Sequence, residues 1–172
     1  MKILLTNDDG YSAEGIISLA LALADEHDVY VSAPATEKSG AGHALTFNRT
    51  LCWTQVSPAE MLLKNAAGRD NPFHAVHGSP ADAVKFALEY IYRGEKFDLV
   101  ISGINSVLNV GSDIIYSGTF GAAEEGSVLG VPGIAVSTVA ADGGYELAAR
   151  FVKENLNALY AATSPYVTVN VN

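Results

Sequence analysis

Cysteine is nearly absent from the sequence. Cys52 is the only one, which excludes an intramolecular disulfide and argues against a cysteine-based zinc site. Because Cys52 stands between Leu51 and Trp53, we expect it to be a small, buried hydrophobic residue. We therefore assign this thiol no role in function.

Basic residues are also scarce. Lys and Arg together number 10 against 19 Asp and Glu, so the formal net charge is −9 at pH 7. This balance argues against long-range attraction to a nucleic acid polymer or to an anionic membrane. A small phosphorylated substrate remains compatible with it, because a bound metal ion changes the sign of the local potential.

No apolar run in the chain is long enough to span a bilayer. The most apolar helix candidate, residues 16–24, is too short and is flanked by acids. The N-terminus has one lysine and then enters a strand pattern, without the pattern of a signal peptide. We therefore expect a cytoplasmic protein. Its 172 residues, 49% of them hydrophobic and 17% charged, suit one ordinary domain with a real core.

Strand-like and helix-like patterns alternate along the chain. The first three form a β-α-β unit, with Ser12 as the expected N-cap of the helix, and this implies a parallel pair of strands. The alternation predicts the α/β class, with a mostly parallel sheet between two layers of helices. Residues 103–119 are expected to be a long loop, and residues 58–72 are the least patterned segment. The expected strands are 2–6, 28–33, 51–55, 73–76, 99–102, 133–137 and 166–171, and the expected helices are 13–26, 80–92, 118–129 and 145–158.

Two adjacent carboxylates follow the first strand pattern. Asp8 and Asp9 come after an apolar run, and ionised side chains at the mouth of a buried strand lose hydration. A cation compensates for that loss, and the carboxyl ends of the strands are where open α/β sheets bind ligands. Hard cations such as Mg²⁺ or Mn²⁺ prefer oxygen ligands. The alternative is an ordinary turn with solvated acids, for which Asn-Asp-Asp-Gly is suitable chemistry.

The loop after the second strand, residues 38–43, reads Lys-Ser-Gly-Ala-Gly-His. Its glycines permit a close approach of the backbone to a ligand, and Ser39 offers a neutral oxygen. By topology this loop lies beside Asp8. It is not a Walker A motif, because the spacing of glycine and lysine is wrong. A surface loop without a ligand is the alternative interpretation.

The densest polar segment follows the strand pattern that ends near Asn105. The loop after it carries Asn109 and Asp113, and a Tyr-Ser-Gly-Thr motif then opens a helix. A helix N-terminus presents free N–H groups and the positive end of a dipole, which together suit an anion. The hydroxyls of Ser117 and Thr119 add donors there, and Asn105 can supply a carbonyl oxygen to a metal ion. The alternative is a glycine-rich turn before an N-capped helix.

The motif Gly-Ser-Pro-Ala-Asp at 78–82 has the Ser-x-x-Asp spacing of a capping box, with proline in the first turn of the helix. We interpret it first as a helix start, on the ligand edge of the sheet. His43, His74 and His77 lack the spacing of a helical metal site, so each is expected on the surface or in a loop. His43 is the best placed of the three for catalysis.

Together these segments resemble the SurE family, the stationary-phase survival proteins that act as metal-dependent nucleotidases. The resemblance spans essentially the whole chain in order, and its Asn-Asp-Asp-Gly and Tyr-Ser-Gly-Thr blocks are specific. The matching residues are 3–10 with Gly15, then Ala33-Pro34, Ser39-Gly40, 78–82, 98–105, Asn109, Gly111, 116–119, 121–123 and 169–172.

The resemblance implies a Rossmann-like, three-layer αβα sandwich and one divalent metal ion, Mg²⁺ or Mn²⁺. The ligands of that ion would be Asp8, Asp9, Ser39 and Asn105. The resemblance also implies hydrolysis of 5′- and 3′-nucleoside monophosphates and, in some members, of short polyphosphate. The expected partner is thus a small nucleotide, and neither a nucleic acid polymer nor a membrane.

The expected reaction is metal-assisted hydrolysis of a phosphomonoester. Asp8 or Asp9 would orient a water molecule or take its proton, which makes both candidate catalytic residues. The helix start at 117–119 would hold the non-bridging oxygens as negative charge shifts in the transition state. The residues expected to contact phosphate or substrate are Asn7, Gly40, His43, Asn109, Ser117, Gly118 and Thr119.

Two features depart from the family pattern. Val107 stands where the family usually has glycine, and a β-branched residue resists the φ > 0 turn that glycine often serves. The chain also stops after a strand pattern, so we expect residues 1–172 to be a single domain without the family's C-terminal extension. That extension supplies oligomer contacts, so a homodimer is expected rather than a tetramer. The departures leave a second interpretation open, a catalytically impaired nucleotide- and metal-binding module.

Two other classes of protein place acids after the first strand. A haloacid-dehalogenase phosphatase needs Asp-x-Asp there, whereas residues 8–10 of this chain are Asp-Asp-Gly. A receiver domain needs a phosphoacceptor aspartate at the end of its third strand and a late lysine. In this chain Asp98 begins a strand pattern and Lys153 lies inside a helix pattern. Both classes therefore fit the sequence less well than a metal-dependent nucleotidase does.

Overall fold

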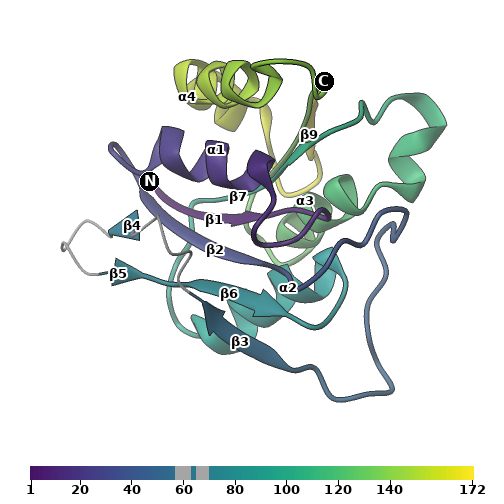
Figure 1. The fold of residues 1–172 in the computed structure, drawn as a ribbon. Coiled ribbons are helices and arrows are strands. Elements are labelled where there is room, and N and C mark those ends of the chain that lie inside the picture. Colours follow the sequence, from purple (N-terminus) through teal and green to yellow (C-terminus); the bar gives the residue numbers. More distant parts are fainter. Residues whose placement is uncertain (57–62, 65–69) are drawn as a thin grey trace.

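A seven-stranded sheet forms the centre of the molecule (Figure 1). The structure, a computed structural model, describes residues 1–56, 63–64 and 70–172. The strand order is β3-β6-β2-β1-β7-β8-β9, and neighbours are parallel except for the antiparallel pair β3 and β6. The short strands β4 and β5 form a separate antiparallel pair. The strands are β1 (Lys2–Thr6), β2 (Asp28–Pro34), β3 (Trp53–Val56), β4 (Leu63–Lys64), β5 (Asp70–Asn71), β6 (Phe73–Val76), β7 (Leu99–Asn105), β8 (Gly133–Ser137) and β9 (Val169–Val171).

Helices cover both faces of the sheet. On one face lie α1 (Glu14–Leu23) and α4 (Gly144–Ala162), and on the other lie α2 (Pro80–Phe86) and α3 (Gly118–Val128) (Figure 1). A π-helical turn, η1 (Ala87–Ile91), continues α2, and a short 3₁₀ helix, η2 (Gly111–Tyr116), precedes α3. The predicted α/β class with three layers is therefore confirmed. Within the described ranges, no helix combines the length and the apolar character needed to cross a membrane.

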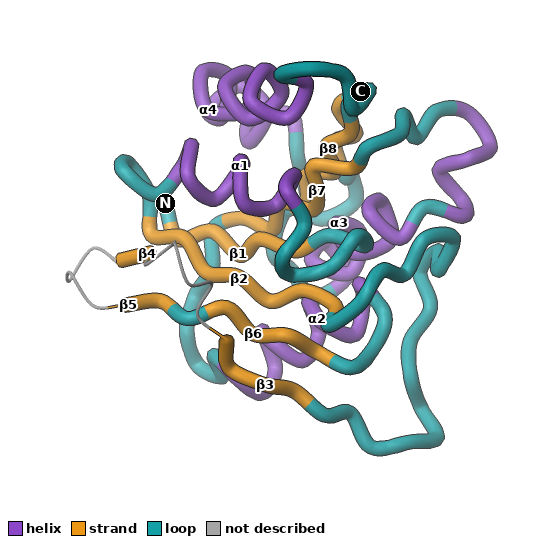
Figure 2. The backbone as a smooth tube through the Cα atoms, in the orientation of Figure 1, coloured by secondary structure: helices purple, strands orange, loops and turns teal. Residues whose placement is uncertain are grey.

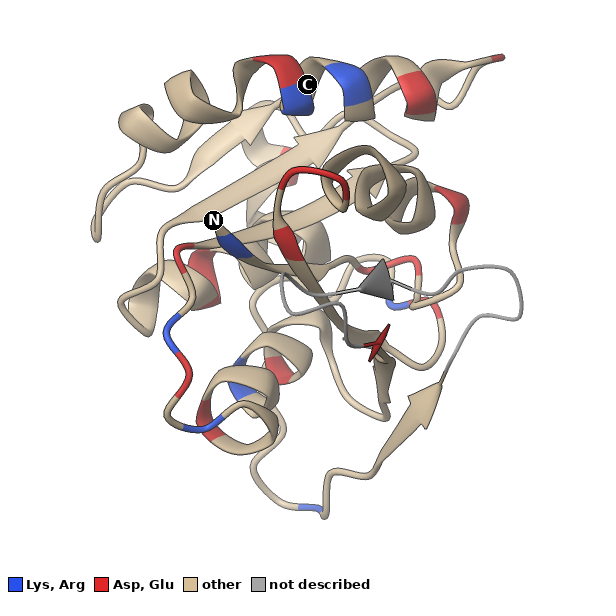
Figure 3. Ribbon diagram, turned by 90° about the vertical axis from the view of Figure 1, so that its left-hand side faces the viewer, with Lys and Arg blue, Asp and Glu red and all other residues tan. Residues whose placement is uncertain are grey.

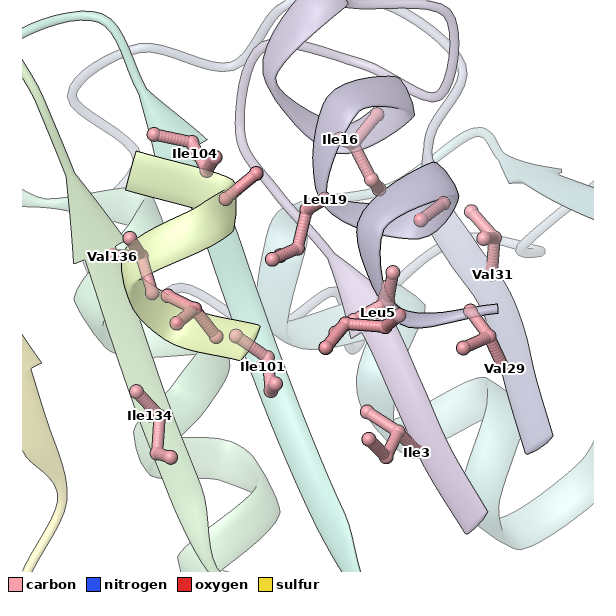
Figure 4. Packing of buried hydrophobic residues seen from close by; sticks show 14 of the residues in the cluster. Ile3, Leu5, Ile16, Leu19, Val29, Val31, Ile101, Ile104, Ile134 and Val136 are labelled. Carbon is pink, nitrogen blue, oxygen red and sulfur yellow. The ribbon is translucent and has the colours of Figure 1, made fainter. Parts of the chain in front are cut away.

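The apolar core lies on both sides of the sheet. Along β1, Ile3 and Leu5 belong to the cluster under α1 and α4, whereas Leu4 belongs to the cluster under α2 and α3. Figure 4 shows the first cluster, in which Ile16 and Leu19 of α1 lie over the strands. Because both faces of β1 are covered, its sequence is a continuous apolar run and not an alternating one.

Helix α1 approaches the sheet most closely at Gly15. A Cβ atom on this residue would lie 2.1 Å from the carbonyl oxygen of Ile104 in β7, far inside van der Waals contact. Backbone packing therefore requires glycine at this position. Ile104 directly precedes Asn105, so the same contact sets the distance between α1 and the polar end of β7.

Several predicted boundaries are wrong at the ends of elements. β7 extends to Asn105, so residues 103–105 are strand, and the rest of the predicted loop contains η2. β9 covers only the last three residues of the predicted strand 166–171. The N-cap of α1 is Ala13 instead of Ser12, because the Ala13 N–H donates to the Gly10 carbonyl and closes a turn just before the helix. The unpatterned segment 58–72 lies for the most part outside the described residues.

Two predictions of burial are also wrong. Cys52 is exposed, because it precedes β3, an edge strand whose residues are mostly exposed. His74 is only 4% exposed, because it lies in β6, which is flanked by β2 and β3. The order of strands in the sheet decides both outcomes, and local sequence does not reveal that order. His43 and His77 are exposed, as predicted.

The burial of His74 leads us to expect a loss of stability in acid. Its Nδ1 atom lies 2.8 Å from the Tyr92 hydroxyl, and desolvation lowers the pKa of the imidazole below its ordinary value of 6.5. The unfolded chain takes up a proton near pH 6.5 that the folded protein binds only at lower pH. The stability contributed by neutral His74 is therefore complete above pH 6.5 and decreases as the pH falls below it.

Urea unfolding at about pH 7.5 and about pH 5.5 checks this expectation. The midpoint should fall in acid, and His74→Gln should fall less than the unchanged protein. His77→Gln alters an exposed histidine three positions along the chain, just after β6, so it is the matched control and should keep the full dependence. Equal pH dependence in His74→Gln and the unchanged protein would contradict the assignment.

Helix α2 begins with the predicted capping box. The Ser79 hydroxyl accepts a hydrogen bond from the Asp82 N–H (3.0 Å), and the Ser79 N–H donates to the Asp82 carboxylate (2.8 Å). The same carboxylate accepts hydrogen bonds from the backbone N–H and the hydroxyl of Thr46. The capping box therefore also ties the segment after His43 to α2.

Candidate active site

A cavity of about 470 Å³ lies at the carboxyl edge of the sheet. Figure 2 shows the loops after β1, β2 and β7 on the same side of the molecule, and all three contribute to the cavity wall. The four residues predicted to bind a metal ion, Asp8, Asp9, Ser39 and Asn105, all line it. The described lining residues are Asp8, Asp9, Glu37, Ser39, Gly40, Asn105, Ser106, Val107, Leu108, Asn109, Asp113, Tyr116 and Ser117.

Asp8 is held by the first turn of α3. The Thr119 hydroxyl donates to Oδ1 of Asp8 (2.6 Å), which leaves Oδ2 as the oxygen available to a ligand. A Cβ atom on Gly118 would lie 2.8 Å from the Asp8 Cβ, so the helix start packs directly against the aspartate. Burial raises the pKa of Asp8, and hydrogen bonds from the hydroxyl and the backbone of Thr119 oppose that rise.

Asp9 is less buried than Asp8, and its pKa is also raised. Burial, followed by the charges of Asp8 and Glu37, raises the pKa of Asp9 to about 6. Like charges this close disfavour each other's ionised form unless a cation lies between them. The raised pKa values of the two aspartates therefore identify a place where a cation would be stabilised.

The charged side chains in the wall of the cavity are all acidic. Asp8, Asp9, Glu37 and Asp113 contribute carboxylates, and no Lys, Arg or His is found among its described lining residues. Elsewhere on the molecule, charged residues lie mostly on helices and loops and the sheet carries few (Figure 3). The four carboxylates would repel a phosphate dianion that entered this cavity alone. A bound cation would offset this repulsion for an anionic substrate.

The two neutral residues of the predicted metal site have their donor groups engaged. The Ser39 hydroxyl donates to Oε1 of Glu37 (2.7 Å). The lone pairs of Ser39 Oγ are not used in that bond and remain available to a ligand. The Asn105 amide nitrogen donates to the Val107 carbonyl (2.6 Å), which leaves Oδ1 as the acceptor of that amide. Both side chains therefore offer an oxygen of the kind that hard cations prefer.

The donor set suits Mg²⁺ or Mn²⁺ better than a transition metal that prefers nitrogen or sulfur. Across residues 1–56, 63–64 and 70–172, no group of three or more His, Cys, Asp or Glu side chains is arranged to hold a metal ion. The predicted site has only two carboxylates, and a hydroxyl and an amide complete it. Few carboxylates and several neutral or water oxygens are typical of hard divalent cations.

Val107 causes no strain in the cavity wall. None of the described non-glycine residues has a positive φ, and in this loop the left-handed conformation falls on Gly111 (φ +58°). Val107 itself is 66% exposed and lines the cavity. The loop thus accommodates a β-branched residue where the family usually has glycine.

Some predicted substrate contacts have other partners. The Asn7 side chain hydrogen bonds twice with the Gly10 backbone and closes the turn that presents the aspartates. Thr119 is completely buried against Asp8. His43 contacts Glu124 and Glu125 of α3. Asn7, Gly118, Thr119 and His43 are not among the described lining residues of the cavity.

The other predicted contacts do face the cavity. Gly40, Asn109 and Ser117 line it, although the Asn109 amide nitrogen donates to Ser137 (3.1 Å) and the Ser117 hydroxyl caps α3 by accepting from the Phe120 N–H. Sequence reasoning missed Glu37 and the apolar part of the wall. Glu37 stands two residues before Ser39, so its proximity to a predicted ligand was a usable signal.

Comparison with known proteins finds matches along nearly the whole chain. The family model described as survival protein SurE matches residues 3–172. The chain is 44% identical over 174 residues to a protein of Petrotoga mobilis and 42% identical over 174 residues to one of Thermosipho melanesiensis, each named 5′-nucleotidase SurE. Both matches cover 100% of this chain but only 66% and 64% of those relatives, so the chain spans less than two thirds of their length.

A solved structure is similar over the same range. The crystal structure of the SurE protein from Aquifex aeolicus superposes with a TM-score of 0.82 at 36% sequence identity. The match covers 100% of this chain and 66% of that one. The likeness supports the Rossmann-like, three-layer αβα fold independently of the strand order described above.

Proposed function

This chain belongs to the SurE family, and on that premise we propose that it is a divalent-metal-dependent phosphomonoesterase acting on nucleoside 5′- and 3′-monophosphates. The observation that carries the proposal is the cavity that Asp8, Asp9, Ser39 and Asn105 all line. An acidic cavity repels a phosphate ester unless a cation is bound there. The oxygen donors of this cavity suit such a cation. The relatives named 5′-nucleotidase support the nucleotide as substrate.

In the proposed reaction, the metal ion, the aspartates and the cavity wall have separate roles. A divalent ion held by Asp8, Asp9, Ser39 and Asn105 would polarise a phosphoryl oxygen as a Lewis acid and would lower the pKa of a water molecule. Asp9, which lines the cavity beside Asp8, orients a water molecule or accepts its proton. Thr119 acts through Asp8 by fixing its carboxylate. Gly40, Asn109 and Ser117, which line the cavity, surround the phosphate.

We also propose that residues 1–172 form a single domain that works as a cytoplasmic homodimer. The family resemblance supports this assembly. Light scattering of the purified chain tests it, since a monomer or a tetramer at micromolar concentration would each contradict the dimer.

Phosphate release from 5′-AMP and 3′-AMP tests the proposed activity. With Mn²⁺ or Mg²⁺ we expect release that EDTA abolishes and added metal restores. Metal and nucleotide binding without release would identify an impaired binding module instead. No binding and no release from folded protein under several metals would reject the proposal.

Loss of the Thr119 hydroxyl is expected to weaken the enzyme without removing a ligand. Thr119→Val keeps the shape of the side chain but leaves Asp8 without the 2.6 Å hydrogen bond that orients it. We expect kcat/KM to fall about 10- to 100-fold, the usual range for groups that orient a metal ligand. Thr119→Ser restores a hydroxyl and should recover most of the activity. Equal losses in the two variants would show that packing, and not the hydrogen bond, matters there.

A further inference from the structure

A cluster of ionisable side chains lies at the far end of the loop that carries Ser39. Nε2 of His43 lies 2.7 Å from Oε2 of Glu125, and Nδ1 of His43 lies 3.3 Å from Oε2 of Glu124. The second oxygen of Glu125, Oε1, lies 3.6 Å from Nζ of Lys85 in α2. The Glu125 side chain is only 3% exposed, so its carboxylate is buried between two basic groups.

This cluster stands apart from the acidic cavity. None of His43, Lys85 and Glu125 belongs to the described lining of that cavity. Burying a carboxylate is costly unless close partners replace its water, and here each oxygen has one. Because both of its oxygens have partners, the buried carboxylate of Glu125 in α3 has a fixed position. It can therefore hold other segments in place.

The loop from Lys38 to His43 bridges the Asp8 loop and α3. Its first residue, Lys38, donates its N–H to the Asp8 carbonyl (2.7 Å), and Gly42 donates its N–H to the Tyr116 carbonyl (3.0 Å). His43 follows Gly42 directly and is fastened to Glu125. Ser39 therefore lies between the Lys38 hydrogen bond to the Asp8 loop and the His43 contact with α3.

The loop backbone rests directly on the helix. A Cβ atom on Gly121 would lie 2.6 Å from the Gly42 carbonyl oxygen and 2.9 Å from the Cα of His43. No side chain lies between the two backbones in this contact. The positions of Gly42 and His43 therefore depend on the position of α3. Besides the His43–Glu125 contact, this end of the loop is held by the backbone hydrogen bond to Tyr116, and Thr46 beyond it is held by Asp82.

We propose that His43 and Glu125 form a positioning pair that holds the Ser39 loop against α3 and so places Ser39 for the divalent ion. The inference rests on the proposed function, because it takes Ser39 as a metal ligand. His43 then acts through the loop, and not by touching the substrate as the sequence suggested. Lys85 balances the buried carboxylate from α2 and joins the second helix to the arrangement.

Manganese binding measured by electron paramagnetic resonance tests the pair, because free Mn²⁺ gives a signal that bound Mn²⁺ loses. We expect His43→Ala to raise the dissociation constant about tenfold, within the range seen for groups that orient a ligand. In a Ser39→Ala background the same substitution should change the constant less than about twofold, because its effect passes through Ser39. His43→Gln can still donate to Glu125 and should recover part of the affinity, whereas the control His77→Ala should bind as the unchanged protein does.

The outcomes separate this inference from the proposed function. Failure of the unchanged protein to bind Mn²⁺ would overturn the proposed function. If the unchanged protein binds but His43→Ala binds equally well, or loses the same affinity with and without Ser39, the positioning pair alone is overturned. Circular dichroism establishes that each variant is folded, and His43→Gln carries the same comparison if His43→Ala is not.

Discussion

Asp8→Asn is expected to lower kcat/KM for nucleoside monophosphates by about 100-fold or more. The amide keeps the size of the side chain and can still accept the Thr119 hydrogen bond, but it removes a negative charge from the proposed metal site. Losing a direct ligand should cost more than the 10- to 100-fold typical of the groups that orient ligands. Phosphate release at saturating Mn²⁺, together with the Mn²⁺ dissociation constant, measures the effect.

The same variant should not be less stable in the absence of metal. Burial raises the pKa of Asp8, so the folded metal-free protein holds that charge at a cost which the neutral amide removes. Loss of activity with an unchanged or higher Tm would therefore mark a functional carboxylate. Asp142→Asn, which changes an exposed aspartate elsewhere, is the control. A fall in Tm for Asp8→Asn with unchanged Mn²⁺ affinity would indicate a structural role instead.

Gly15→Ala is expected to cause the largest loss of stability. Its methyl group would lie 2.1 Å from the Ile104 carbonyl oxygen, and neither backbone can yield without moving α1 away from β7. Overpacking typically costs about 1–3 kcal/mol, and a backbone contact this short belongs at the upper end of that range. A loss of about 3 kcal/mol corresponds to a Tm lower by about 6–12 °C in a chain of this size.

Thermal unfolding of Gly15→Ala and Leu21→Ala checks this expectation. Leu21 lies on the same helix and is 58% exposed, so its truncation should change stability by no more than about 0.5 kcal/mol. Alanine has the higher helix propensity, by about 1 kcal/mol. A Tm that rises in Gly15→Ala would mean that this propensity outweighs the contact and that α1 can shift freely.

Local patterns in the sequence predicted most of the fold because both faces of the sheet are covered. Buried parallel strands such as residues 2–6 are continuous apolar runs, and the helices between them are rich in Ala and Leu. The same topology brought Asp8, Ser39 and Asn105 to one cavity, since the carboxyl ends of neighbouring parallel strands share an edge. Strand ends were therefore the right place to look for chemistry.

The errors arose where a residue's environment is set by distant segments. Cys52 and His74 differ in burial because one precedes an edge strand and the other lies inside the sheet. Thr119 stands in a motif that suits phosphate, yet its hydroxyl is committed to Asp8. A helix N-terminus in the sequence indicates that an anion can be held there, and here the nearest anion is a side chain of the protein itself.

The hydrogen bond between Thr119 and Asp8 joins residues that are 111 positions apart in the chain. Closing a loop of that length is entropically costly, so we expect this contact to form late in folding, after neighbouring strands have paired. A cation that needs Asp8 in this orientation therefore meets its full site only in the nearly finished fold. Bound Mn²⁺ should accordingly slow unfolding much more than it speeds folding, so its stabilising effect appears as kinetic persistence of the native state.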